Sequence, residues 1–423
     1  MRRVTMPHRA GKPSGGARRN GRATTAGALL LAGTLAAVSP ASPASASPAA
    51  PAAPAAPASG AAAAPGKLSL PEPTGSHPVG TTSVHLKDTS RADPWVPSVK
   101  ARELMVSLWY PARSPGRQRA RYMTPKESEL FLKDAKLTDL PPALLSTTRT
   151  NAFSDAKPVG RAHGLPLVVL SPGSGKPRST LTALAEDLAS RGYVVAAIDH
   201  TYETVATTFP DGRVTTCVPC EGDHDPSMST KQVKVRAADV SFVLDRLTGP
   251  RPAWKGGRLI DRSRMGMAGH SIGGASTVAA LAADSRLRAG IDIDGTTPPD
   301  TLTRELKRPF MFFGKPATYT PGSGNESTAT WERDWKLMTG WKRWLLVTGA
   351  EHASFNDVGV LAGQLGIDFG ADLPSERGLA ITRTYVAAFF GRHLLNKPQP
   401  LLDAPSASYP EVKHCVPEKK TCA

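Results

Sequence analysis

The chain has 423 residues, 40% of them hydrophobic, and carries a formal net charge of +16 at pH 7. This length is sufficient for one large folded domain. Lys and Arg form no block with interleaved aromatic side chains, which argues against a nucleic-acid-binding module.

The first 46 residues have the organisation of a secretory signal peptide. Residues 1–22 contain seven basic residues and no acidic one, an apolar run covers Ala23–Val38, and small residues end at Ala44-Ser45-Ala46. This pattern predicts export with cleavage after Ala46. The apolar run is shorter than the ~20 residues that span a bilayer, so a permanent membrane anchor is the weaker alternative. The export route, Sec or Tat, stays open.

The remaining chain divides by composition at residue 66. Residues 47–66 are almost entirely Ala and Pro, so this segment is expected to be a disordered linker. Residues 67–423 are predicted to form a single α/β domain. Without the seven signal cations the net charge falls to +9. That charge could favour phospholipid or cell-wall surfaces, but a simple solubility charge is the preferred interpretation.

Apolar strands and amphipathic helices then alternate along the chain. Two alternating runs, 81–87 and 103–110, predict an antiparallel strand pair, and residues 126–150 are helix-prone. Further strands are expected at 165–170, 193–198, 264–268, 289–293, 309–313 and 344–347, and helices at 181–191, 231–247, 272–283 and 378–395. The pattern predicts an α/β fold, a mostly parallel sheet with helices on both faces. Ligands in such folds bind at the carboxyl ends of the strands.

The four cysteines predict disulfides, because an even count in an exported protein is typical of them. Cys217 and Cys220 form a C-x-x-C pair, and Cys415 and Cys422 lie near the end of the chain. Of the three pairings, the two local ones are the simplest. A redox role for the first pair and a zinc site are weaker alternatives.

Gly269-His270-Ser271-Ile272-Gly273 matches G-x-S-x-G between a predicted strand and a predicted helix. In that context the glycines permit a sharp turn that exposes the serine hydroxyl. We therefore predict Ser271 as a nucleophile and the Ile272 N–H as one oxyanion donor. A serine in an ordinary glycine-rich bend is the alternative interpretation.

A second oxyanion donor is expected in Ser171-Pro-Gly-Ser-Gly175, which directly follows the strand at 165–170. Position favours the N–H of Ser174, with Gly175 as the neighbouring alternative. A phosphate loop is excluded because Pro177 stands where Ser or Thr would bind magnesium.

The base and the acid should follow the serine in the chain. His352 lies in the loop after the strand at 344–347, whereas His393 and His414 lie on a helix and in the tail. Residues 314–325 contain no Asp or Glu, so the acid is sought one strand earlier, in "GIDIDG". Strand alternation places Asp292 and Asp294 on the same side. Asp294 is preferred because it is the last residue before the loop.

The motifs "GHSIGG", "GIDIDG" and "TGAEHASFND" resemble the group II platelet-activating-factor acetylhydrolases and related secreted bacterial lipase-like proteins. The resemblance covers about residues 79–395. It implies an α/β-hydrolase fold and a secreted, monomeric serine esterase without metal or cofactor, which acts on short acyl esters, including phospholipid sn-2 esters, with transient lipid-surface contact. The loop at 171–175 departs from the His-Gly of that family, so the acyl pocket is expected to differ.

Two other functions remain alternatives: a lipase, cutinase-type or amide hydrolase, and a non-catalytic binding protein on the same fold. Several residues have both a functional and a structural interpretation. His270 is expected to pack rather than react, and His200 and Glu203 either line the site or support a loop. The acidic segment 221–225 is interpreted as a solvated loop rather than a calcium site, and Trp331, Trp335, Trp341 and Trp344 mostly as core packing.

Overall fold

The computed structural model describes residues 67–221 and 226–423. The predicted signal peptide (1–46) and linker (47–66) lie outside this part of the chain, as does most of the acidic segment 221–225. These three predictions are therefore untested.

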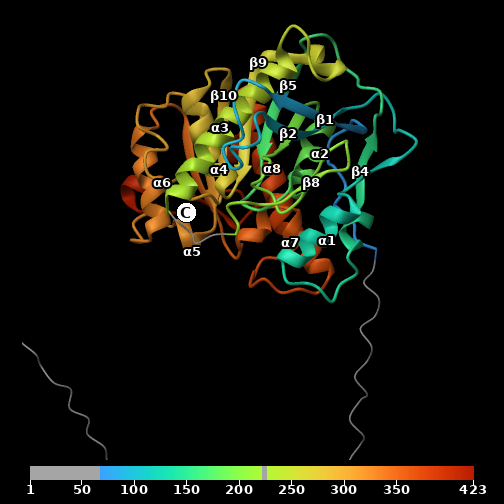
Figure 1. The fold of residues 1–423 in the computed structure, drawn as a ribbon. Coiled ribbons are helices and arrows are strands. Elements are labelled where there is room, and N and C mark those ends of the chain that lie inside the picture. The colour runs from blue at the N-terminus through green and yellow to red at the C-terminus, as the bar shows by residue number, and fades with distance from the viewer. Residues whose placement is uncertain (1–66, 222–225) are drawn as a thin grey trace, which may run out of the picture. The chain divides into compact units, whose positions relative to one another are not determined.

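A twelve-stranded sheet forms the centre of the described chain, in the order β14-β13-β12-β11-β10-β9-β5-β6-β2-β1-β4-β3 (Figure 1). The six strands from β6 to β12 in this order are mutually parallel, and β2 joins them antiparallel to β6. The strands are β1 (Val79–Asp88), β2 (Arg102–Pro111), β3 (Arg119–Arg121), β4 (Arg149–Ser154), β5 (Leu165–Ser171), β6 (Val194–Asp199), β9 (Ile260–His270), β10 (Leu287–Ile293), β11 (Phe310–Gly314), β12 (Lys342–Val347), β13 (Val412–Val416) and β14 (Thr421–Cys422), with a separate hairpin of β7 (Thr207–Thr208) and β8 (Val214–Thr215).

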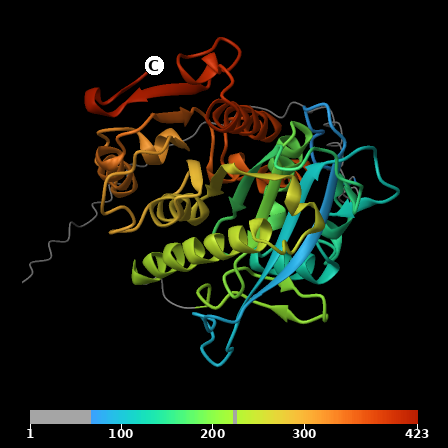
Figure 2. The same ribbon diagram turned by 90° about the horizontal axis from the view of Figure 1, so that it is seen from above.

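Helices cover both faces of this sheet, and α3 and α8 lie on opposite sides of it (Figure 2). The helices are α1 (Pro125–Asp134), α2 (Thr182–Ser190), α3 (Pro226–Thr248), α4 (Ile272–Ala283), α5 (Pro316–Tyr319), α6 (Glu326–Leu337), α7 (Asp357–Gln364) and α8 (Ser375–Leu395). The predicted mostly parallel sheet between two helical layers is thus confirmed.

Strand β5 shows how the sequence builds two cores. Val168 and Leu170 pack in the cluster formed with α2 and α8, whereas Leu167 and Val169 pack in the cluster formed with α3, α4 and α6. Successive strand residues point to opposite faces, and both faces are covered here. An uninterrupted apolar run is therefore the pattern that a central strand of this sheet requires.

Short elements near the sheet edges differ from the sequence prediction. The helix-prone segment 126–150 contains α1 but then a 3₁₀ turn, η1 (Leu144–Thr147), and the start of β4. Strands β13 and β14 were not predicted. They pair antiparallel with Cys415 opposite Cys422, and these cysteines form one disulfide. Cys217 and Cys220 form the other, so the local pairing is confirmed.

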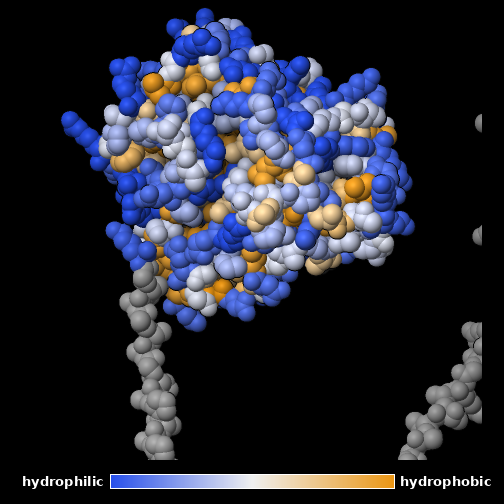
Figure 3. Space-filling view, turned by 180° about the vertical axis from the view of Figure 1, so that it is seen from behind, coloured by the Kyte–Doolittle hydropathy of each residue, from blue (hydrophilic) through white to orange (hydrophobic). Residues whose placement is uncertain are grey.

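Few large hydrophobic side chains of the described residues are exposed at the surface. Within the described ranges, Val218 and Val416 are the large hydrophobic residues that are more than a third exposed, at 39% and 42%. Hydrophobic residues are scattered among hydrophilic ones on the face seen from behind (Figure 3). No helix in residues 67–221 or 226–423 is long and apolar enough to cross a membrane.

Three of the four tryptophans singled out in the sequence are core residues. Trp331 and Trp344 have no exposed surface and Trp335 is 8% exposed, which confirms their packing role. Trp331 stacks on Tyr319 with 3.8 Å between ring centroids, and its Nε1–H donates a 2.6 Å hydrogen bond to the carbonyl of Gly295.

Replacing Trp331 with Ala should lower the free energy of unfolding by about 4 kcal/mol, because a large cavity replaces a fully buried indole. Urea denaturation followed by circular dichroism measures this change. The control Val416→Ala removes an exposed side chain and should change the free energy by less than about 0.5 kcal/mol. Equal effects of the two substitutions would contradict the assignment of Trp331 to the core.

Candidate active site

The predicted site residues meet at the carboxyl ends of four parallel strands. Ser174 follows β5, Ser271 follows β9, Asp294 follows β10 and His352 follows β12. Together with Ile272, all of them line one cavity of about 410 Å³. Its other lining residues are Ser229, Gln232, Thr296, Lys315, Thr318 and Tyr319. This is the edge of the sheet at which such folds bind ligands.

Ser271 stands on a strained turn between β9 and α4. Its backbone has φ 58° and ψ −129°, and its N–H donates to the carbonyl of Ile293 at 2.8 Å. A Cβ on Gly269 would lie 2.1 Å from the backbone of Gly273, and one on Gly273 would lie 2.0 Å from the Ser171 carbonyl oxygen. Both glycines are therefore required for the backbone to make this turn.

An aspartate and a histidine are joined in the cavity. The distance from Asp294 Oδ2 to His352 Nδ1 is 2.5 Å, and Asp294 Oδ1 accepts the backbone N–H of Lys315 at 2.9 Å. The Asp294 side chain is 2% exposed, whereas the His352 side chain is 48% exposed. In the described chain no hydrogen bond joins the Ser271 hydroxyl to His352. Catalytic hydrogen bonds often tighten only when substrate binds.

Asp292 has a different environment from Asp294. It has no exposed surface, and its Oδ1 accepts the Gly295 N–H at 2.9 Å. A Cβ on Gly274 would lie 1.9 Å from this oxygen, so the carboxyl packs directly under the start of α4. Burial raises the pKa of Asp292 well above its usual value.

The side chains of the two aspartates lie in different places because the backbone of Asp294 is not extended like that of a strand residue. Its φ of 55° lies in the left-handed region, where strand alternation no longer applies. This rotation directs Asp294 toward His352. Asp292 is still within β10 and remains beneath the turn between β9 and α4.

His270 packs beside the site. Its Nε2–H donates to the carbonyl of His352 at 2.9 Å, and the two rings lie 4.3 Å apart. Burial, with His352 nearby, lowers the pKa of His270 well below its usual value, so the ring is neutral. Asn356 Nδ2 lies 3.3 Å from its Nδ1. Asn356 and the backbone of Lys315 are supports that no sequence motif indicated.

The backbone N–H groups of Ser174 and Gly175, in the loop after β5, differ in their hydrogen bonding. Gly175 N–H donates to the carbonyl of Glu203 at 3.0 Å and is therefore occupied. In the described part of the chain, the N–H of Ser174 has no such partner. Ile272 is the first residue of α4, so its N–H has no acceptor within the helix. Ser174 and Ile272 both line the cavity.

In residues 67–221 and 226–423 no three His, Cys, Asp or Glu side chains cluster so as to hold a metal ion.

The sequence of the chain is similar to those of known esterases. Residues 62–248 and 255–397 match the family model of platelet-activating factor acetylhydrolase, isoform II. A probable 1-alkyl-2-acetylglycerophosphocholine esterase of Arthroderma benhamiae is 29% identical over 380 residues, which are 82% of this chain and 94% of the relative. A platelet-activating factor acetylhydrolase of Canis lupus familiaris is 25% identical over 363 residues, 77% of either chain.

A solved ferulic acid esterase from Streptomyces cinnamoneus is 42% identical, with a TM-score of 0.72, and the match covers 82% of this chain and 99% of the esterase. This neighbour and the strand order establish the α/β-hydrolase fold. The matched relatives are esterases, which supports an ester hydrolase. The chain belongs to the platelet-activating factor acetylhydrolase isoform II family.

Proposed function

We propose that the protein is an exported serine carboxylic ester hydrolase that works through an acyl-enzyme on Ser271. The observation that carries this proposal is the Asp294–His352 hydrogen bond of 2.5 Å in the cavity that Ser271 enters from a strained turn. A nucleophile, a base and an orienting acid in this order are typical of α/β-hydrolases. The two disulfides favour an oxidising compartment and thus export.

The proposed reaction begins with proton transfer from Ser271 Oγ to His352 Nε2 as the oxygen attacks the ester carbonyl. Asp294 accepts the Nδ1–H of His352, which leaves Nε2 free for this proton, and its charge stabilises the imidazolium. The Ser174 and Ile272 N–H groups hold the tetrahedral oxyanion. One such donor contributes about 3 kcal/mol to transition-state stabilisation.

Collapse of this intermediate breaks the bond to the alcohol oxygen, which receives the proton from His352. A water molecule then attacks the acyl-enzyme while His352 Nε2 takes one of its protons. The second tetrahedral intermediate releases the carboxylic acid and returns the proton to Ser271. Every step uses side chains and N–H groups that line one cavity.

For the substrate, we infer a short acyl group on a polar alcohol, including the sn-2 ester of a phospholipid. Family membership and the Arthroderma relative support this class. Hydroxyl and amide side chains such as Thr296, Thr318 and Gln232 dominate the cavity wall, which suits a polar leaving group. A lipase or cutinase-type preference for long chains is the alternative that the chain-length test below examines.

Hydroxycinnamate esters are a second candidate substrate class. The ferulic acid esterase is 42% identical to this chain, a greater identity than that of the acetylhydrolase relatives described above.

A fluorophosphonate probe should label the folded wild-type protein and should fail to label Ser271→Ala, because only an activated serine attacks the probe at neutral pH. In-gel fluorescence measures the labelling. Absence of labelling of folded wild-type protein would favour the non-catalytic binding protein instead.

Asp294→Asn should lower kcat by roughly 10⁴-fold, because an amide favours the wrong tautomer of His352. Asp292→Asn is the matched control. It replaces a buried carboxyl that accepts the Gly295 N–H and makes no contact with His352, and kcat should stay within about threefold. Steady-state kinetics on p-nitrophenyl acetate measures both, and a larger loss in the Asp292 variant would reverse the assignment of the acid.

p-Nitrophenyl acetate and butyrate should give kcat/KM values roughly 10-fold above that of the palmitate ester, since a polar cavity gains little from a long chain. The same assay on methyl ferulate and on a 1-alkyl-2-acetyl phosphocholine lipid distinguishes the two substrate classes. Highest kcat/KM on palmitate would contradict the short-chain proposal.

A further inference from the structure

A second Ser–His–Asp array lies buried beneath the loop that presents Ser174. Ser171 Oγ is 3.0 Å from His200 Nε2, and His200 Nδ1 is 2.9 Å from Asp239 Oδ2. Each of these three residues has no exposed surface. No ester can reach them, so the array is not a second nucleophilic site.

The hydrogen bonds of this array have a defined direction. Arg236 Nη1 donates to the Pro172 carbonyl at 2.5 Å and to Ser171 Oγ at 3.3 Å. Since Ser171 Oγ receives this N–H, its own proton is available to His200 Nε2 at 3.0 Å. The Nδ1–H of His200 then donates to Asp239. The series of hydrogen bonds runs from Arg236 through Ser171 and His200 to Asp239.

Charge keeps this direction fixed. Burial and the neighbouring Arg236 lower the pKa of His200, which keeps the ring neutral. Burial opposes ionisation of Asp239, but the Arg102 guanidinium holds the pKa of this carboxyl far below its usual value. Arg102 Nη2 donates to Asp239 Oδ2 at 2.8 Å and Arg91 Nη2 to Oδ1 at 2.6 Å. Asp239 therefore remains paired even without His200.

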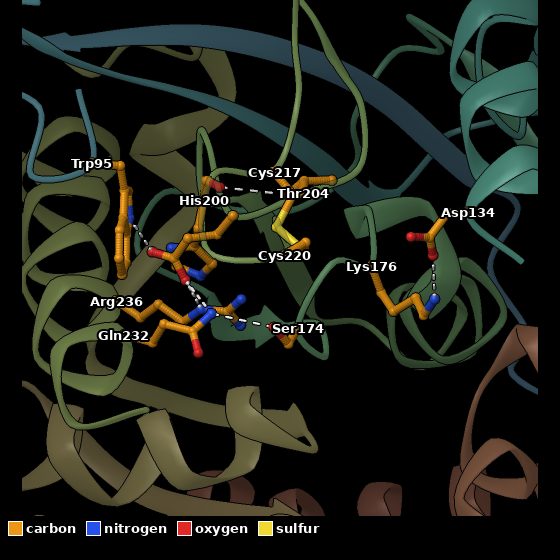
Figure 4. The surroundings of a disulfide bond; sticks show 11 residues. Trp95, Asp134, Ser174, Lys176, His200, Thr204, Cys217, Cys220, Gln232 and Arg236 are labelled. Atoms are coloured by element: carbon orange, nitrogen blue, oxygen red, sulfur yellow. Dashed lines mark hydrogen bonds and ion pairs between the residues drawn. A yellow bond between two sulfur atoms is a disulfide. The ribbon is translucent and has the colours of Figure 1, made fainter. Parts of the chain in front are cut away.

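A second set of contacts holds the far end of the loop. Gly175 exchanges two 3.0 Å backbone hydrogen bonds with residues 203–205, and Arg236 Nε donates to Glu203 Oε2 at 2.7 Å. Gln232 Nε2 lies 3.3 Å from Ser174 Oγ. Figure 4 shows His200, Gln232 and Arg236 gathered beside Ser174, close to the Cys217–Cys220 disulfide. The loop is held at both ends, and Ser174, between them, lines the cavity.

We propose that Ser171, His200 and Arg236 are positioning residues that fix residues 171–175 so that the Ser174 N–H points at the oxyanion. This role rests on the proposed function of the site. A buried ionic network contributes little net stability compared with apolar packing, whereas a displacement of about 1 Å at a reacting centre costs about 100-fold in rate. The network therefore acts on the geometry of the transition state.

Kinetics of Ser171→Ala test this role. The variant should lose about 10-fold in kcat while KM stays within about twofold, because only transition-state binding is affected. Its affinity for a trifluoromethyl ketone, which forms a tetrahedral adduct with Ser271, should fall by the same factor. Ser190→Ala is the matched control. Ser190 is equally buried, lies on α2, and its hydroxyl bonds Gly75 and Asp187, so this variant should lose stability without loss of kcat.

A pair of substitutions at His200 isolates the contact with Ser171. In His200→Gln the amide can occupy the Nε2 position and accept from Ser171, whereas in His200→Asn it can reach only Asp239. The Gln variant should keep kcat within about threefold of wild type and the Asn variant should lose about 10-fold. Thermal melting shows whether each variant is folded. If Ser171→Ala does not fold, the two His200 variants still test the positioning role.

Equal loss of kcat in the two His200 variants, or full kcat in Ser171→Ala, would contradict the positioning role while leaving the esterase proposal intact. A folded wild-type protein that neither reacts with fluorophosphonate nor cleaves any ester would instead overturn the proposed function, and the positioning role with it.

Discussion

The strained backbone of Ser271 is the constraint on which the rest of the site depends. A non-glycine residue at φ 58° and ψ −129° carries a cost of order 1–3 kcal/mol, which the surroundings must offset. They do so through the Ser271 N–H bond to Ile293 and through two glycines whose missing side chains let β5, β9 and α4 meet. The same turn begins α4, whose first residue, Ile272, lines the cavity and has an N–H with no acceptor within the helix. The proposed nucleophile and one proposed oxyanion donor thus depend on a single backbone conformation.

Access to solvent distinguishes two similar groups of side chains. Ser271, His352 and Asp294 border a cavity, and the His352 side chain is 48% exposed. Ser171, His200 and Asp239 show the same order of contacts but no exposure. A Ser–His–Asp pattern alone therefore assigns no chemistry. The exposed group can meet a substrate, whereas the buried group can act only on the position of the loop that it supports.

Much of the fold was readable from the sequence, because the central strands are covered on both faces and so consist of continuous apolar runs such as "LPLVVL" in β5. Strands β13 and β14 were missed because short edge strands carry no such run. The choice between Asp292 and Asp294 required a left-handed φ that alternation does not encode. The bond from the Gly175 N–H to the Glu203 carbonyl, which favours Ser174 as the second donor, joins two loops and leaves no pattern in the sequence. The hydrogen-bond partners of His200, Ser171 and Asp239, lie on other elements, and no local motif connects them.

The central claim is that Ser271 becomes acylated during turnover. Rapid-quench mass spectrometry of the protein mixed with p-nitrophenyl acetate tests this directly. The account predicts a burst of p-nitrophenol close to one equivalent per protein, accompanied by one acetyl group on the peptide that contains Ser271. Turnover with no acetylated Ser271 peptide, or with the acetyl group on another residue, would contradict it.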